Sequence, residues 1–134
     1  MIISSRIARR AAAVGVAAML AGGLGMSSAS ASVMSSGGGC SGYSDAGYGV
    51  SINSCISASG GTVYPDAYVS GSVSNCTLYI DLIKNGSVVS TRTASCSGHV
   101  TGYSASGSGT YFTGVYAVVG GNYTSEIVSP YEYN

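Results

Sequence analysis

The side chains that could carry out chemistry are few, because the chain of 134 residues contains one histidine and five acidic residues. His99 could serve as a general base for Ser95 or Ser97, with Asp81 holding its ring in place. Serine is so frequent here that composition alone supplies such a trio, and the sequence contains no G-x-S-x-G turn. We therefore predict that the protein has no catalytic residues and is not an enzyme.

Patterns for other kinds of site are also missing from the sequence. Glycoside hydrolysis needs two carboxylates facing one cleft, and the available ones are Asp45, Asp66, Asp81, Glu126 and Glu132. A small domain offers little cleft for such a pair. No Cys-x-x-Cys spacing accompanies the single histidine, and no lysine follows the three glycines at 37–39. We expect no metal and no cofactor.

The four cysteines are better explained as two disulfides. Even numbers of cysteines in small exported chains usually form such bridges. Three pairings are possible, and we favour Cys40–Cys55 and Cys76–Cys96 because the second pair lies near the open end of a predicted hairpin.

An export signal is predicted at the N-terminus. Residues 11–25 are apolar and small, residues 29–31 read Ala-Ser-Ala, and the basic residues before them are Arg6, Arg9 and Arg10. This pattern is typical of a secretory signal peptide at 1–31, and the apolar run is too short for a membrane span. We favour general secretion over the twin-arginine route, and a free extracellular protein over a lipid-anchored one.

The charge of the mature chain limits its partners. After residue 31 only Lys84 and Arg92 oppose the five acidic residues, so the net charge is −3 (two positive against five negative). Nucleic acids and anionic membrane surfaces are bound chiefly through lysine and arginine. We therefore expect neither as a partner, and we expect no membrane anchor.

Residues 32–39 form a small, uncharged segment before the predicted domain at 40–134. Its composition predicts flexibility in the free protein. It is either a plain leader that gives signal peptidase access, or a segment that becomes ordered on a partner. The partner-binding hypothesis concerns Val33, Met34, Ser35, Ser36, Gly37, Gly38 and Gly39.

The elements that must position these residues are predicted to be strands. Valine, threonine and tyrosine alternate with glycine- and serine-rich turns, and no useful window has helical periodicity. Strands are expected at 48–56, 62–64, 67–73, 76–84, 87–95, 99–103, 110–119 and 123–129. Pro65 and Pro130 are expected to end the strands before them, and 110–119 is expected to be central because both of its faces are apolar.

The clearest local signal is the Asn85-Gly86 pair, which favours a two-residue hairpin turn. Counting outward from this turn places Leu82 opposite Val89, Ile80 opposite Thr91, and Tyr79 opposite Arg92. The last pair would lay a guanidinium over an exposed ring.

Tyrosine supplies the strongest hint of function, because all eleven tyrosines follow the predicted signal. Tyrosine is a frequent contact residue that costs little entropy to order. About half of these rings are expected to fill the interior. The rest would form a contact surface for a protein or sugar. The candidates on loops or exposed faces are Tyr43, Tyr48, Tyr64, Tyr68, Tyr79, Tyr103, Tyr123, Tyr131 and Tyr133, and the predicted contact residues are Tyr79, Arg92, Tyr103 and Tyr123.

Residues 108–112, Ser-Gly-Thr-Tyr-Phe, resemble the approach to strand F of immunoglobulin-like domains, where a tyrosine caps the preceding corner. Thr113 stands where antibody domains place a cysteine, so the disulfides must be arranged differently. The fold class that we predict is all-β, a small Ig-like antiparallel β-sandwich of about seven strands with two disulfides.

Cys76-Thr77-Leu78, Lys84-Asn85-Gly86, Cys96 and the run 107–112 are similar to small secreted actinobacterial proteins. One such group is the adaptor subunit of Streptomyces umbrella toxin particles. This resemblance implies an antibacterial complex in which the protein links a large stalk protein to a lectin subunit. It also implies that residues 33–39 insert into the stalk by strand addition.

Two other functions stay open from the sequence. A secreted protease inhibitor would present a rigid loop at 57–62 or 104–109. A small-ligand carrier would hold its ligand in a pocket between strands.

Overall fold

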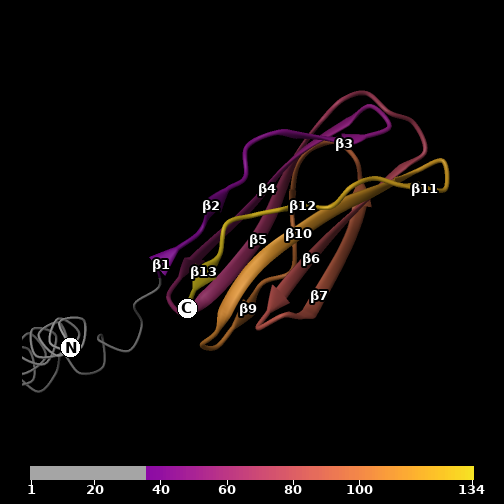
Figure 1. The fold of residues 1–134 in the computed structure, drawn as a ribbon. Coiled ribbons are helices and arrows are strands. Elements are labelled where there is room, and N and C mark those ends of the chain that lie inside the picture. Colours follow the sequence, from indigo (N-terminus) through magenta and orange to yellow (C-terminus); the bar gives the residue numbers. More distant parts are fainter. Residues whose placement is uncertain (1–35) are drawn as a thin grey trace, which may run out of the picture. The chain divides into compact units, whose positions relative to one another are not determined.

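The computed structural model describes residues 36–134, and every regular element within that range is a β-strand (Figure 1). The strands in chain order are β1 (Ser36–Gly37), β2 (Gly39–Cys40), β3 (Ser44–Gly47), β4 (Val50–Ser59), β5 (Thr62–Ser70), β6 (Cys76–Lys84), β7 (Ser87–Ser95), β8 (Gly98–Thr101), β9 (Ala105–Ser106), β10 (Thr110–Val119), β11 (Asn122–Tyr123), β12 (Ile127–Val128) and β13 (Glu132–Tyr133).

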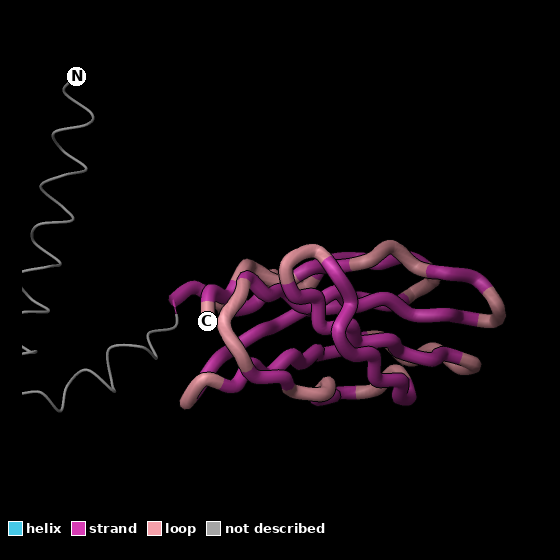
Figure 2. Tube along the Cα trace, turned by 90° about the horizontal axis from the view of Figure 1, so that it is seen from below, coloured by secondary structure: helices cyan, strands magenta, loops and turns pink. Residues whose placement is uncertain are grey.

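Two antiparallel sheets lie in separate layers (Figure 2). The first sheet has the order β1-β13-β10-β6-β7, and β11 and β12 also pair with β10. The second sheet has the order β2-β4-β5-β8, with β3 beside β4 and β9 beside β5. β11, β12 and β13 follow one another along β10 as one interrupted edge strand.

The connections are those of an immunoglobulin-like sandwich, as predicted. The hairpins β4–β5 and β6–β7 lie in different sheets, β8 returns to pair with β5, and β10 returns to pair with β6. At the start of β10, the Tyr111 hydroxyl donates a hydrogen bond to the carbonyl oxygen of Gly107 at 2.8 Å. This is the tyrosine corner that the run at 108–112 predicts.

The core lies between the sheets and is built from the inward positions of their strands. Leu78, Ile80 and Leu82 alternate on β6, and Val115 and Ala117 face them from β10. Where antibody domains have a cysteine, the backbone of Thr113 is held by a side chain from the other sheet. The Ser54 hydroxyl on β4 donates to the Thr113 carbonyl oxygen at 2.9 Å, in a buried position. A hydrogen bond thus joins the layers here.

Both predicted disulfides are confirmed. Cys40–Cys55 joins β2 to β4, where the two residues also face each other in the strand register. Cys76–Cys96 closes the open end of the β6–β7 hairpin. Disulfides of this kind form and persist in oxidising environments, which suggests that the protein functions in one.

The expected break at Pro65 is wrong, because β5 runs continuously through it. The carbonyl oxygen of Pro65 accepts a hydrogen bond from the Gly102 amide, so the proline nitrogen faces the same side. On that side β9 ends its pairing at Val63 and β8 begins at Asp66. The missing N–H therefore interrupts no ladder hydrogen bond. The expected break at Pro130 is confirmed, because β12 ends at Val128 and the next strand, β13, begins only at Glu132.

The hairpin turn at Asn85-Gly86 is confirmed, but the predicted register is wrong. A bulge lies between Leu82 and Ile83, so that Val89 has no opposite residue and the pairing shifts by one. Leu82 faces Ser90, Ile80 faces Arg92, and Tyr79 faces Thr93. The shift turns Arg92 toward the inner face of the first sheet.

The prediction that residues 32–39 are flexible is corrected for residues 36–39. Ser36 and Gly37 pair with β13 in the first sheet, and Gly39 pairs with Ile56 in the second. Gly38 forms the crossing between the sheets, with its amide bonded to the Tyr131 carbonyl oxygen at 2.7 Å. Backbone hydrogen bonds order these small residues, because such bonds do not depend on a side chain. Residues 32–35 and the predicted signal lie outside the described range.

Candidate binding face

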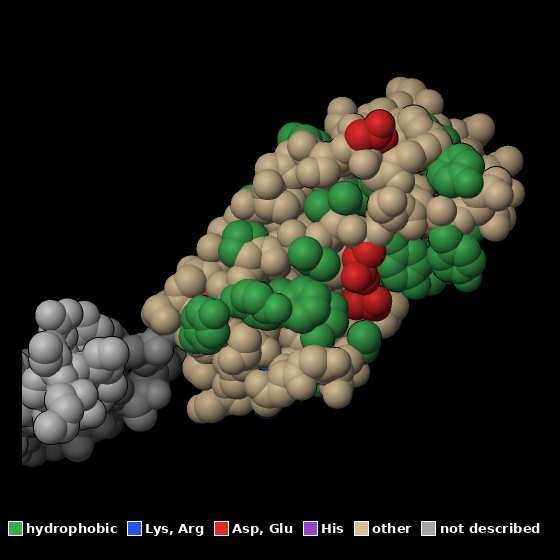
Figure 3. All heavy atoms as spheres, in the orientation of Figure 1, with side chains coloured by type: hydrophobic (Ala, Val, Ile, Leu, Met, Phe, Trp, Pro, Cys, Tyr) green, Lys and Arg blue, Asp and Glu red, His purple; other side chains and the backbone are tan. Residues whose placement is uncertain are grey.

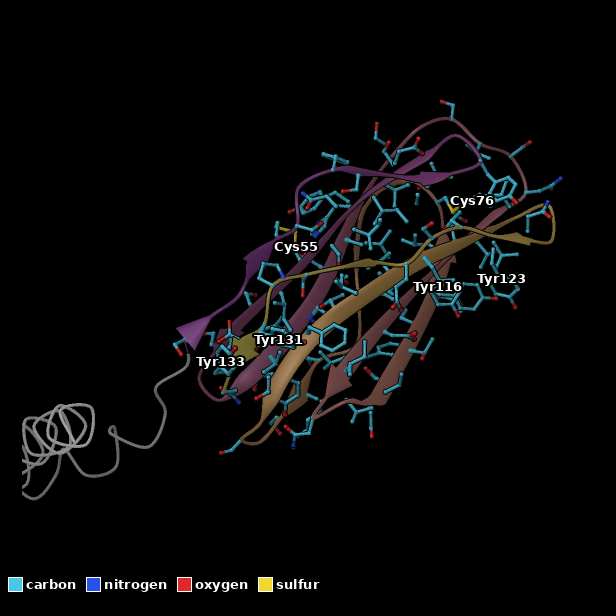
Figure 4. All side chains as sticks on the ribbon, viewed as in Figure 1. Cys55, Cys76, Tyr116, Tyr123, Tyr131 and Tyr133 are labelled. Carbon is cyan, nitrogen blue, oxygen red and sulfur yellow. A yellow bond between two sulfur atoms is a disulfide. The ribbon has the colours of Figure 1, made fainter. Side chains whose placement is uncertain are left out.

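The outer surface of the first sheet carries a row of aromatic side chains that we call the aromatic face. β10 creates it by alternation: Tyr111 and Thr113 point into the core, whereas Phe112 and Tyr116 point outward. Neighbouring strands add further rings on the same side, and Figure 4 labels several of them. The face consists of Tyr79, Phe112, Tyr116, Tyr123, Tyr131 and Tyr133.

The rings of the aromatic face form two groups. Tyr79 and Tyr116 face each other across β6 and β10, with ring centroids 4.9 Å apart and planes within 2° of parallel. Tyr123 extends this group from β11, with its centroid 6.0 Å from that of Tyr116. It is 71% exposed, so this group presents apolar carbon to solvent.

The second group lies nearer the C-terminus. Phe112 meets the edge of Tyr131 at a centroid distance of 5.5 Å, and Tyr133 lies 6.3 Å beyond Tyr131. About half of the surface of each of these two tyrosines is exposed. Offset and edge-on packing of this kind holds rings rigidly, which lowers the entropy cost of binding a partner.

Two carboxylates separate the aromatic groups. Asp81 is directly opposite Gly114 in the β6–β10 register, and Glu126 Oε2 lies 2.7 Å from where a Cβ of Gly114 would be. Glycine at this position therefore makes room for the glutamate. Figure 3 shows the acidic surface between two apolar patches on this side. The Asp81 carboxylate also accepts a hydrogen bond from the Thr91 hydroxyl at 2.5 Å.

The carboxylates act on the neighbouring phenol. Burial against the sheet, reinforced by the negative charges of Asp81 and Glu126, raises the pKa of Tyr116 above its usual value of 10.0. Tyr116 therefore stays a neutral hydroxyl that can donate or accept a hydrogen bond at ordinary pH. The face combines flat rings, neutral hydroxyls and two negative charges, which suits a partner with planar or basic groups.

The predicted contact residues are divided between two places. Tyr79 and Tyr123 both lie in the aromatic face, where Tyr116 joins them. Arg92 does not reach Tyr79, so the predicted pair is wrong. Its guanidinium lies 5.8 Å from the Tyr103 ring centroid and donates to Thr101 at the edge where β7 meets the second sheet. Tyr103 and Arg92 thus form a separate contact that closes this edge.

The predicted N-terminal site residues have mixed outcomes. Ser36 and Gly37 lie in β1, at one edge of the first sheet, and Gly39 lies in β2. Gly38 crosses between them. Val33, Met34 and Ser35 lie outside the described residues.

The trio considered for catalysis is not assembled. His99 Nε2 lies 2.9 Å from Asp66 Oδ2, and its ring stacks on Tyr68 with centroids 4.4 Å apart. These contacts belong to the outer surface of the second sheet, whereas Asp81 lies on the outer surface of the first. Over residues 36–134, no three histidine, cysteine or acidic side chains gather as a metal site would need. In that range there is also no helix that could cross a membrane.

Sequence reasoning missed four members of the site: Tyr116, Phe112, Asp81 and Glu126. The i, i+4 spacing of Phe112 and Tyr116 does place both on one face of a strand. That this face is the outer one depends on pairing with β6, which lies about thirty residues earlier in the sequence and is a long-range contact. The two carboxylates meet only because β6 and the segment before β12 flank β10.

The fold and the face together define a disulfide-bonded, all-β domain of the immunoglobulin-like sandwich class with an aromatic outer surface. Comparison of the chain with protein-family models, with curated proteins and with solved structures finds no match.

Proposed function

We propose that the protein is a secreted, non-enzymatic adaptor that holds a protein partner on its aromatic face. The observation that carries this proposal is the arrangement of six aromatic rings, three exposed and three partly buried, around two carboxylates on one sheet. Tyrosine-rich centres with few charges are typical of protein contacts. The rings are fixed by their neighbours before any partner arrives, so less ordering is required on association.

A second attachment point is the N-terminal edge. β1 is the outermost strand of the first sheet, and both of its residues are exposed. An edge strand offers unpaired backbone groups to an extended segment of another protein. Residues 33–35 directly precede β1, and in this proposal they extend the same edge when a partner strand is added.

An adaptor with two attachment points fits the resemblance to the umbrella toxin adaptor. On that basis we propose that the N-terminal edge engages a large stalk protein and that the aromatic face engages a lectin subunit. The complex would act in competition between bacteria. The N-terminal edge borders the aromatic face at Tyr133, which pairs with Ser36. In this proposal the stalk protein adds to the edge of the sheet while the lectin covers its outer face.

A pull-down from culture medium tests this proposal. The tag is placed after Asn134 on a flexible linker, because β13 pairs with β1 and a tag at the N-terminal end would block insertion of residues 33–35. Co-purification of a large repeat protein together with a lectin is the expected result. Recovery of a single protease would instead support the inhibitor function, and recovery of the protein alone would contradict the adaptor.

Deleting residues 32–35 separates the two attachment points. We expect this variant to lose the stalk protein and keep the lectin, because β1 and the aromatic face remain. Retention of both partners would show that the N-terminal segment takes no part in binding.

A further inference from the structure

A groove lies on the side of the domain where β1 and β2 cross from one sheet to the other. Its volume is about 390 Å³, which is within the usual range for small-ligand pockets. The Cys40–Cys55 disulfide, Ile56 and Ala58 provide apolar wall, and Tyr68 provides an aromatic one. The groove is separate from the aromatic face, which lies on the outer surface of the first sheet.

Two carboxylates line this groove, and each has an oxygen left without a partner. Glu132 is only 3% exposed, and its Oε1 atom is buried with no hydrogen bond to any residue of 36–134. Asp66 Oδ1 is buried in the same unpaired condition, while its Oδ2 is held by His99. Buried polar atoms without partners are rare, because each one costs free energy of folding.

The chain at Gly38 is built closely over the buried carboxyl. A Cβ at Gly38 would overlap Glu132 Oε2, so only glycine lets the backbone cross here. Burial raises the pKa of Glu132, as expected for a carboxyl that lacks a compensating positive charge. No described residue supplies a positive charge to this buried carboxyl, so a cation bound in the groove would stabilise its ionised form.

We propose that this groove binds an organic cation, a guanidinium group on an alkyl stem of the size of an arginine side chain. The guanidinium would pair with Glu132 and Asp66, and the stem would lie along Ile56 and the disulfide. Guanidinium suits the site better than ammonium, because it is weakly hydrated and offers several planar donors to carboxylates. A metal ion would need more ligands than the two carboxylates present.

Calorimetric titration of the mature chain tests the site with a matched pair of probes. Acetyl-Gly-Arg-Gly-amide carries the guanidinium, and the citrulline peptide has nearly the same shape without the charge. We expect one arginine peptide per chain with a Kd between about 10 µM and 1 mM. The citrulline peptide should bind at least about tenfold more weakly, a difference of about 1.4 kcal/mol.

Variants of the chain assign the binding to the groove. Glu132→Gln and Asp66→Asn should each weaken the arginine peptide at least about tenfold, whereas Asp81→Asn on the aromatic face should not. Glutamine has the shape of glutamate without its charge, so Glu132→Gln is expected to fold, which thermal unfolding would verify. Agmatine, a free guanidinium compound, distinguishes the source: binding of agmatine but not of the peptide indicates a free metabolite rather than a side chain.

The proposal is overturned if neither cation binds, if arginine and citrulline peptides bind equally, or if Glu132→Gln leaves binding unchanged. These results would not affect binding of the lectin to the aromatic face, whose residues do not line the groove. Ser36 and Gly37 line the groove and also form the N-terminal edge, so the stalk partner is tested separately by the deletion of residues 32–35. Failure to recover protein partners in a pull-down would not contradict guanidinium binding in the groove.

Discussion

At the scale of single residues, the carboxylates of the aromatic face add to the effect of burial on the pKa of the Tyr116 phenol. Burial is the largest cause of its raised pKa, and Asp81 is the next largest. We expect Asp81→Asn to lower the pKa of Tyr116 part of the way toward the usual value, because the burial remains. NMR of the protein with ¹³C-labelled tyrosine would follow this phenol through an alkaline titration. An unchanged or higher pKa would contradict the assigned geometry.

The buried side chain of Thr113 carries a hydroxyl that forms no hydrogen bond within residues 36–134. Its backbone, by contrast, is fully bonded to Ser54 and Ser129. Thr113→Val keeps the shape and removes the unsatisfied group. We expect the free energy of unfolding to rise by about 1 kcal/mol, measured by urea denaturation. Thr93→Val on the exposed side of β7 is the control and should change stability by less than about 0.5 kcal/mol.

The raised pKa of Glu132 predicts that the stability of the protein depends on pH. Its pKa is raised in the folded protein, so folding favours the protonated form. The stabilisation is fully present below the unfolded pKa of about 4.3 and is lost as the pH rises through the higher folded value. Glu132→Gln should therefore be more stable than the wild type at neutral pH, with the difference shrinking as the pH falls to about 4. Urea denaturation between these pH values measures it, and a constant difference would contradict the account.

At the scale of elements, the crossing from β1 to β2 is held chiefly by backbone hydrogen bonds and one disulfide. Cys40–Cys55 ties β2 to β4 beside the groove. Replacing both cysteines by alanine should lower the free energy of unfolding by about 2–4 kcal/mol. Amide exchange should rise first at residues 36–40, because two-residue strands provide few other contacts. Equal exchange throughout the domain would show that the crossing is not locally dependent on the disulfide.

The sequence predicted elements well where the signal was local. The Asn85-Gly86 turn, the long strand at 110–119 and the disulfide pairs are all confirmed, since each depends on turn chemistry, alternation or loop length. No pattern in the sequence indicates the bulge after Leu82. Because of this bulge, Arg92 lies on the inner face of the first sheet. β1 could not be predicted because Ser36 and Gly37 are held by β13 at the far end of the chain. β2 left no side-chain alternation to detect, because it is only Gly39 and Cys40 paired with β4.

At the scale of the whole molecule, the sandwich gathers six aromatic rings on the outer surface of the first sheet, although exposed tyrosines such as Tyr64 and Tyr68 also lie on the second. Its two unpaired carboxylates line one groove. Half of the site could be predicted, because tyrosine content is visible in composition. The other half could not, since the row of rings exists only when β6, β10 and the C-terminal strands lie side by side. The described domain therefore presents two separate surfaces, the aromatic face and the groove.

The measurement that tests the central claim most directly is the affinity of the co-purified lectin for two matched variants. Tyr116→Ala removes a ring at the centre of the aromatic face, whereas Tyr64→Ala removes a similarly placed ring from the outer surface of the second sheet. We expect Tyr116→Ala to weaken binding by about 1–2 kcal/mol, or roughly 5–30-fold in Kd, with Tyr64→Ala unchanged. Equal affinities for both variants and the wild type would contradict the proposal that the aromatic face binds the partner.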